Sequence, residues 1–411
     1  MKTLKTLMNH VKKEGIKPTI EKSFARVATR YNFIPKSQYK KDTLEQTYHK
    51  MNTHIQSKEE IKGLYFINAA HGFEEVFNQR TINFAKYLAQ NNYIVAYIRW
   101  QWDYADRDSR DFTQVYPNIF QLPLFPFLLN KESLAIFNEN QKEKGFISTF
   151  PVKSMYDIFS SMKSQGYNLY YDIMDEWEEF SLVGQAPWYE RETEENYIKI
   201  SDHVVAVSAP LQEKFQHLKP IDVVGNGYSV AISKYPDIAC KTKKEDGKIH
   251  IGYFGHMTED WFDWDVVFHL ADNPQNEIHL VGHGMSDATL EKMNTYNNIH
   301  FYGKVHPSEL HTYVKEWHIG LIPFKPSVLS KAVDPIKIYE YVFFGLETIS
   351  TGIPHIGKYP TVTHLDDPST VVEVAQSIYE KIEKNEEDPN RQQFLHETTW
   401  DYRFDQILKK Q

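Results

Sequence analysis

Two opposite charges interrupt an otherwise apolar segment at residues 334–345, DPIKIYEYVFFG. Asp334 and Pro335 are typical of a helix start, so we expect Asp334 as the N-cap and Pro335 as the first helical residue. In such a helix Lys337 and Glu340 lie on one face. An ion pair between them would contribute only about 0.2–0.5 kcal/mol, and burying a pair for stability alone is often unfavourable. The two charges therefore favour a binding site over a salt bridge.

The ligand that suits these residues is a nucleoside diphosphate. A helix N-terminus presents free amide groups and the positive end of the helix dipole, and Lys337 adds a full charge for the phosphates. Glu340, one turn further along, can accept hydrogen bonds from two neighbouring hydroxyls, such as those of a ribose. A predicted strand at 319–324 ends just upstream, so the helix would begin at the carboxyl edge of a sheet.

A second group of candidates follows a predicted strand at 167–175. Asp172, Asp175 and Glu176 offer carboxylates that could act as a general base on an acceptor hydroxyl. Asp175 is the preferred base because it stands at the end of the strand. Helix capping or a solvated loop is the alternative for each of these acidic residues.

The elements that position both groups alternate along the chain. Short apolar runs that predict strands are separated by amphipathic segments that predict helices, and this alternation restarts after a hydrophilic stretch at 234–248. Such alternation is typical of parallel sheets covered on both faces. We therefore expect an α/β protein with two doubly wound domains that face each other across a cleft, with ligand at the carboxyl ends of the strands. The expected strands before the stretch are 63–70, 93–100, 167–175, 202–208 and 221–227.

Length and composition set the domain boundaries. A chain of 411 residues exceeds what one core usually serves. We expect a basic amphipathic arm at 1–50, an N-terminal Rossmann-like acceptor domain at 60–235 and a C-terminal Rossmann-like donor domain at 248–385. A final helix at 388–411 is expected to return to the N-terminal domain.

Charge is divided unevenly along the chain. Residues 1–41 hold eleven Lys or Arg against two Glu, a net charge of +9, whereas the whole chain carries −9, which leaves −18 on the remainder. Two basic amphipathic helices in this arm predict binding to an anionic membrane surface, and packing of these helices on the protein's own body is the alternative. The single cysteine, Cys240, and the absence of a long apolar run predict a cytoplasmic protein, peripheral to the membrane at most. No nucleic-acid partner is expected.

Segment 334–345 resembles the P-x-K-x-Y-E-Y-x-x-x-G signature of nucleotide-sugar glycosyltransferases of the GT-B fold, in the family 4 and glucuronosyltransferase-like groups. Other segments agree in order, so the resemblance spans residues 63–408 and is strongest from 200 onward. The resemblance implies that Lys337 binds the diphosphate and Glu340 the ribose, with Tyr339 grouped in the same donor site. These further segments are 170–180, 201–211, 223–229, 251–265, 298–314, 319–324 and 399–408.

The resemblance also implies contacts beyond this helix. Gly255 and His256 would lie against the phosphates, where a glycine permits close approach of the backbone. Lys304 and Val305 would lie near the base, although Gly303 before them could equally be an ordinary turn glycine. On the acceptor or sugar side, the resemblance implies roles for His71, as a second catalytic candidate, and for Gly72, Arg80 and Asp172.

One position departs from the pattern. Family 4 enzymes usually carry a Glu eight residues before the ribose-binding Glu, and Ala332 stands there in this chain. The expected function is metal-independent transfer of a sugar from a UDP-, GDP- or dTDP-sugar to a cell-surface glycan, teichoic-type polymer or lipid-linked acceptor, with no further cofactor. A non-catalytic GT-B partner of another glycosyltransferase is the alternative that Ala332 favours, and a sugar-nucleotide epimerase is a third.

Overall fold

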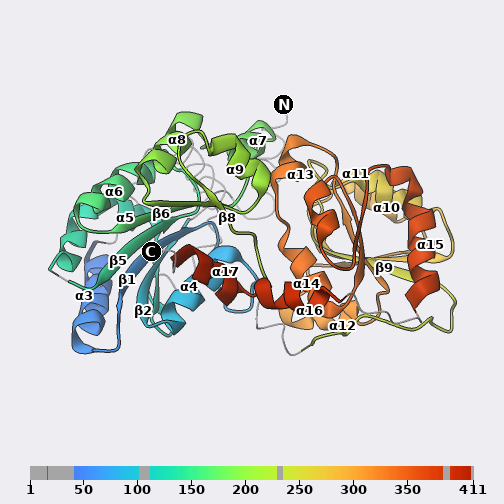
Figure 1. Ribbon diagram of the computed structural model, residues 1–411, viewed down its shortest axis with the longest axis horizontal. Coiled ribbons are helices and arrows are strands. Elements are labelled where there is room, and N and C mark those ends of the chain that lie inside the picture. The colour runs from blue at the N-terminus through green and yellow to red at the C-terminus, as the bar shows by residue number, and fades with distance from the viewer. Residues whose placement is uncertain are drawn as a thin grey trace. The chain divides into compact units, whose positions relative to one another are not determined.

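The computed structural model describes residue 16 and residues 41–100, 112–139, 141–228, 235–382 and 389–408. Two compact units are present. The first comprises described residues within 1–75, 79–206 and 212–222, and the second those within 76–78, 207–211 and 223–411. Each unit is built on its own sheet (Figure 1), which confirms the expected α/β class.

The first sheet has eight strands in the order β3-β4-β2-β1-β5-β6-β7-β8. Strands β4 to β7 are parallel and β3 pairs antiparallel with β4. Every residue of β1 is buried, as expected of a central strand covered on both faces. The strands are β1 (Gly63–Ala69), β2 (Tyr93–Arg99), β3 (Gln114–Tyr116), β4 (Ile119–Pro123), β5 (Glu143–Ser148), β6 (Asn168–Ile173), β7 (His203–Ala206) and β8 (Asp222–Val223).

Helices lie on both faces of this sheet (Figure 1). The first of them, α3 (Lys41–Ser57), was not expected, because its sequence is polar overall. Its Leu44, Tyr48, Met51 and Ile55 nevertheless repeat every three to four residues and are buried, so the first unit begins well before residue 60. The other helices are α4 (Arg80–Gln90), α5 (Leu124–Leu129), η3 (Lys131–Phe137), α6 (Lys153–Ser164), α7 (Trp177–Leu182), α8 (Arg191–Ile200) and α9 (Ala209–Phe215).

The second sheet is entirely parallel, with the order β11-β10-β9-β12-β13-β14. This is the 3-2-1-4-5-6 order of doubly wound nucleotide-binding sheets, in which ligands bind at the carboxyl ends of the strands where the order reverses. Here the reversal falls between β9 and β12. The strands are β9 (Ile249–His256), β10 (Asn276–His283), β11 (Ile299–Gly303), β12 (Ile319–Pro323), β13 (Glu347–Thr351) and β14 (Val362–Leu365).

The segment expected as one final helix at 388–411 forms two helices, α16 and α17, which are grouped with the second unit. Among the described residues, no helix is both long enough and apolar enough to cross a membrane. The predicted membrane-binding arm lies almost wholly outside the described residues. The helices of the second unit are α10 (Trp264–Ala271), α11 (Asp287–Met293), η5 (Pro307–Glu309), α12 (Leu310–Val314), α13 (Val328–Ala332), α14 (Ile336–Phe344), η6 (Pro354–Lys358), η7 (Pro368–Thr370), α15 (Val371–Lys381), α16 (Arg391–Glu397) and α17 (Trp400–Leu408).

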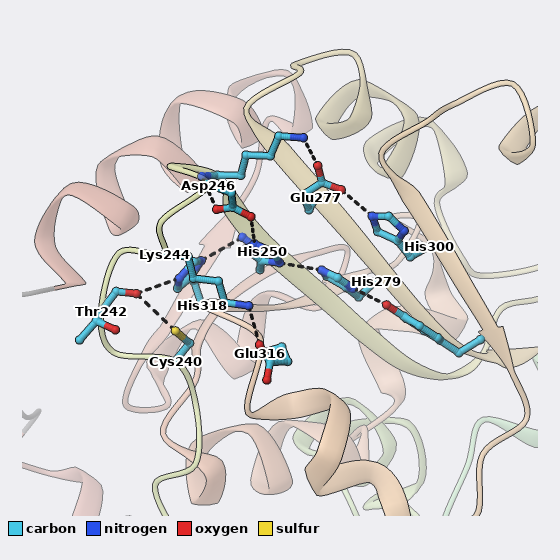
Figure 2. A network of polar contacts seen from close by, with 12 residues as sticks. Cys240, Thr242, Lys244, Asp246, His250, Glu277, His279, His300, Glu316 and His318 are labelled. Atoms are coloured by element: carbon cyan, nitrogen blue, oxygen red, sulfur yellow. Dashed lines mark hydrogen bonds and ion pairs between the residues drawn. The ribbon is translucent and has the colours of Figure 1, made fainter.

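A network of histidines joins neighbouring strands toward the amino end of the second sheet (Figure 2). His250 of β9 and His279 of β10 stack, with Nδ1 of His250 2.9 Å from Nε2 of His279. His318, which directly precedes β12, accepts the backbone N–H of His250 at Nδ1 (2.9 Å) and donates from Nε2 to the Thr242 carbonyl (3.1 Å). These contacts hold three strands of the sheet in register.

The partners of the rings assign their protons. The Asp246 carboxylate only accepts, so Nε2–H of His250 donates to it across 3.0 Å. Nδ1 of neutral His250 must then accept from Nε2–H of His279, whose Nδ1 in turn accepts from the Tyr302 hydroxyl at 2.8 Å. Burial lowers the pKa of His250, His279 and His318, which favours the neutral rings assumed here, and both nitrogens of each ring are occupied.

We expect the second unit to lose stability on acidification. Burial lowers the pKa of His318 to about 4 and that of His279 to about 3. The unfolded chain protonates histidines near pH 6.5, so stability is full above about pH 6.5 and is lost as the pH falls from there toward 4. The expected loss is about 1.4 kcal/mol per pH unit for each ring, and calorimetric unfolding between about pH 7.5 and about pH 5.5 measures it.

His318→Asn provides the matched test, because its amide oxygen can still accept the His250 N–H but cannot titrate. The pH slope of stability should be smaller in this variant and unchanged in His396→Asn, which alters an exposed histidine of the same unit. Equal slopes in all three proteins would contradict the assignment.

Candidate functional site

The N-terminus of α14 lacks a side-chain cap. The helix begins at Ile336, with Pro335 as the capping residue and no side-chain hydrogen bond to the first turn. Asp334 was expected as the N-cap, but its carboxylate instead accepts the Asn226 N–H (2.5 Å) and the Tyr339 hydroxyl (2.7 Å). Asp334 therefore occupies none of the first amide groups of the helix. The Ile338 amide donates to the Pro335 carbonyl (3.1 Å), which leaves those of Ile336 and Lys337 for an anion.

Lys337 carries a charge that the surrounding protein does not neutralise. Within the described part of the chain, no hydrogen bond or ion pair within 4.0 Å involves its ammonium group, and none joins it to Glu340. The ammonium instead lies 5.2 Å from the ring centroid of Tyr253 and 5.4 Å from that of Phe324. Burial lowers its pKa to about 8, against the opposing effect of Glu340. A cation held in this way is suited to an external anion.

Glu340 is 7% exposed, and within the described ranges its one hydrogen-bond donor is the Asn78 amide, 3.0 Å from Oε1. Burial raises its pKa to about 7, although Asn78 and Lys337 both oppose the rise. The Asn78 amide oxygen accepts from the indole of Trp400 in the same unit, which fixes its orientation. The second carboxylate oxygen of Glu340 is left for a ligand such as a ribose hydroxyl.

Tyr339 is placed differently from expectation. Its side chain is fully buried, stacked on Phe394, and its hydroxyl donates to Asp334. A nucleotide contact conflicts with this burial. Tyr339 lies on the buried face of α14, whereas Lys337 lies on a different face of the helix. Tyr339 therefore packs α14 against Phe394 and holds Asp334 in place.

The other donor-site candidates gather at the carboxyl edge of the second sheet. Gly255 and His256 end β9, and Lys304 and Val305 follow β11 directly. A Cβ at Gly255 would lie 3.2 Å from Cε of Lys337, so the lysine stem lies across this glycine. Lys304 is exposed, whereas Val305 is half-buried against the core.

In the first unit, Arg80 and Asp172 form a buried ion pair. Arg80 opens α4 and its Nε lies 2.7 Å from Oδ2 of Asp172 in β6, with the two side chains 3% and 1% exposed. The sequence placed both residues on the acceptor or sugar side. Their burial indicates that they stay below the surface and fix the end of β6 against α4.

Asp175 lies in the loop after β6 and keeps its candidacy as a base. Burial raises the pKa of its carboxyl to about 7, and the nearby charges of Asp172 and Glu176 add to the rise. A carboxylate that titrates near neutral pH can accept a proton from an acceptor hydroxyl. Glu176 is instead paired with Lys214, which also lies 2.9 Å from Glu178.

His71 and Gly72 follow β1, where the strand order of the first sheet reverses. His71 is exposed and its carbonyl accepts from the Tyr97 hydroxyl (3.2 Å), while Gly72 lies against the Arg99 side chain. Both share the carboxyl edge with Asp175, but β5 separates β1 from β6. His71 and Asp175 therefore do not follow neighbouring strands.

Sequence reasoning missed Glu194 of α8. Its carboxylate accepts from the hydroxyls of Tyr171 (2.7 Å) and Tyr189 (2.9 Å), and burial raises its pKa to about 7. The segment reads only as an amphipathic helix, and no spacing in the sequence announces that Glu194 points inward. It holds β6 and the loop before α8 together.

Two further observations bear on the chemistry. Ala332, in α13, is buried, and its backbone carbonyl accepts from the Ser208 hydroxyl at 2.5 Å. Because the residue is an alanine, its side chain offers no carboxylate at this position. Among the described residues, no group of three or more His, Cys, Asp or Glu side chains is arranged to hold a metal ion.

Comparison with known proteins supports the fold. No family model matches the chain. A segment of 72 residues is 28% identical to TuaH, a provisional teichuronic acid biosynthesis glycosyltransferase of Bacillus subtilis (strain 168). The segment spans only 18% of this chain and 18% of that protein.

Solved structures match over most of their length. The lipopolysaccharide outer core galactosyltransferase WaaB, in its apo form, is similar with a TM-score of 0.56 and 14% identity, covering 85% of this chain and 99% of that one. S. aureus TarM, in a complex that contains UDP, is similar with a TM-score of 0.54 and 7% identity, covering 84% and 99%. The expected GT-B fold is confirmed by these likenesses.

We expect the Arg80–Asp172 pair to be structural. Arg80→Ala leaves the Asp172 carboxylate buried without its cation, which should lower the free energy of unfolding by about 3–5 kcal/mol. The double variant Arg80→Met, Asp172→Leu should recover most of this loss, because no charge then remains buried. Denaturant titration measures both. An unchanged free energy of unfolding in Arg80→Ala would contradict the structural role of the pair.

Proposed function

We propose that the protein is a glycosyltransferase that moves a sugar from a nucleoside diphosphate-sugar to a glycan, teichoic-type polymer or lipid-linked acceptor of the cell envelope. The observation that carries this proposal is the half-buried Lys337 ammonium, which lies at the carboxyl edge of a nucleotide-binding type of sheet and has no counter-ion among the described residues. The GT-B fold, the UDP in the TarM complex and the cell-envelope roles in the names of the similar proteins agree with it.

The donor half of the chemistry belongs to the second unit. The amide groups at the start of α14 and the Lys337 ammonium would bind the diphosphate, and Glu340 would accept from the ribose hydroxyls. As the bond between the sugar C1 and the phosphate oxygen breaks, its electron pair stays on the diphosphate. Lys337 and the helix N-terminus would stabilise this charge, so we propose that no metal ion is required.

The acceptor half belongs to the first unit. The acceptor oxygen would form the new bond to C1, and its proton would pass to Asp175, whose pKa of about 7 suits a base. The buried Arg80–Asp172 pair fixes the end of β6, from which Asp175 follows, and the Asp172 charge adds to the rise in the pKa of Asp175.

A non-catalytic partner protein is the second candidate, favoured by Ala332. It would retain nucleotide binding without transfer. Incubation of the purified protein with UDP-, GDP- and dTDP-sugars separates the two, because only an enzyme would release the free nucleoside diphosphate from a donor. Release of the nucleotide would also exclude an epimerase.

We expect Lys337→Met to weaken UDP, GDP or dTDP binding by about tenfold to a hundredfold, the value of a charge-assisted hydrogen bond. The same variant should not lose stability in the absence of ligand, since it removes a half-buried cation that has no ion-pair partner among the described residues. Glu340→Gln should weaken binding through the ribose. Isothermal titration calorimetry measures the two affinities and denaturant unfolding the stability, with Lys331→Met as a control at an exposed lysine of α13. Unchanged affinity in both site variants defeats the assignment.

We expect Asp175→Asn to lower kcat by about 10²–10⁴-fold while leaving donor affinity unchanged. Because the base must be unprotonated, the rate of the native protein should rise with pH through about 7 and then level off. Steady-state assays across this range test both statements. Glu213→Gln, at an exposed carboxylate of α9, is the matched control, and a pH profile retained in Asp175→Asn would assign the base elsewhere.

A further inference from the structure

Three neighbouring strands of the second sheet end in the same way. Each has a glycine of positive φ at its carboxyl end, and the next residue is basic. Gly255 (φ 136°) and Gly282 (φ 145°) are paired across β9 and β10, and so are the histidines that follow them. The three strand ends are Gly255–His256, Gly282–His283 and Gly303–Lys304.

The two glycines bring the histidines together. A Cβ at Gly282 would lie 1.8 Å from the carbonyl oxygen of Gly255, so the backbones of the two strand ends touch and exclude any other residue. As a result, the ring centroids of His256 and His283 lie only 4.8 Å apart. Gly284 continues this arrangement, because a Cβ there would lie 2.4 Å from the His256 ring.

The nitrogens of these two rings differ from those of the amino-edge network. Both rings are exposed, and in the described ranges of the chain no hydrogen bond to a protein group engages either of them. In Figure 2, by contrast, both nitrogens of His250, His279 and His318 have partners. The carboxyl-edge pair is therefore free to bind a ligand, whereas the amino-edge histidines are committed to the fold.

The charges that face the pair are mostly positive. His256 is reached by Lys337 of α14 and Lys304 after β11, with Asp260 as the opposing carboxylate and the Trp261 ring 5.4 Å away. Partial desolvation of its ring and these two lysines lower the pKa of His256. Partial desolvation, Lys304 and His256 lower the pKa of His283 to about 4. Both rings are consequently neutral at neutral pH when no anion is bound.

We propose that His256 and His283 form a proton-binding pair that takes up one proton when a nucleoside diphosphate binds at the carboxyl edge of this sheet. This inference rests on the proposed function and assigns His283, which lies outside the donor-site residues named above. A diphosphate reverses the sign of the local field, so an imidazolium becomes favourable beside it. Two rings 4.8 Å apart do not both carry a charge readily, which limits the uptake to one.

The proton gives the site a preference for the leaving group. A free nucleoside diphosphate carries more negative charge than the same diphosphate esterified to a sugar. A proton from solvent, held on the pair, compensates the additional charge that forms when the electron pair of the C1–O bond stays on the phosphate oxygen. The pair would therefore favour the products of the cleavage step and act together with Lys337.

Calorimetric titration with UDP tests the pair, in two buffers of different ionisation enthalpy and between about pH 6 and about pH 8.5. The difference in observed heat gives the protons taken up by the complex. We expect about one proton per UDP near neutral pH, with affinity falling by up to about tenfold per pH unit as the pH rises. The double variant His256→Asn, His283→Asn should lose this uptake and its pH slope, apart from the part due to UDP itself, while His396→Asn should retain both.

The outcomes separate the two levels of inference. UDP binding with equal proton uptake in the native protein and the double variant would overturn the proton-binding pair and leave the proposed donor site in place. No binding of UDP, GDP or dTDP to the native protein would overturn the donor site itself. Circular dichroism and thermal unfolding verify that the double variant is folded, which its exposed positions favour.

Discussion

The candidate site of the second unit depends on the half-buried ammonium of Lys337, for which the described residues supply no ion-pair partner within 4.0 Å. Such a charge is costly, and proteins normally pair it or neutralise it. Here Glu340, three residues away, does not close an ion pair with Lys337, and two aromatic rings flank the cation instead. Asp334 could have capped the helix but is bonded to Asn226 and Tyr339, which leaves the positive helix end next to the lysine. This arrangement is suited to an external anion.

The same sheet uses histidine in two ways at its two ends. At the amino end, every nitrogen of His250, His279 and His318 is bonded, and the rings serve as fixed connectors between strands. At the carboxyl end, glycines of positive φ bring His256 and His283 together with their nitrogens available. Hydrogen-bond saturation, rather than residue type alone, separates the histidines that connect strands from the pair that we propose to bind a proton.

Much of the architecture could be predicted from the sequence, because buried parallel strands and the helices between them have distinct hydrophobic periods. The helix bearing Lys337 and Glu340 was anticipated for the same reason. What escaped prediction depends on long-range contacts. Asp334 carries a typical capping signal, yet Asn226, more than a hundred residues away in sequence, engages its carboxylate. The register pairing of His256 with His283 is likewise set by the sheet and cannot be read from either strand alone.

The most direct measurement of the central claim is the position of UDP in a crystal structure of the complex. If the unpaired lysine is a diphosphate site, its Nζ will lie within hydrogen-bonding distance of a phosphate oxygen, about 2.7–3.2 Å, with the diphosphate at the start of α14. A diphosphate bound elsewhere on the protein, with the Lys337 ammonium still without a partner, would contradict it.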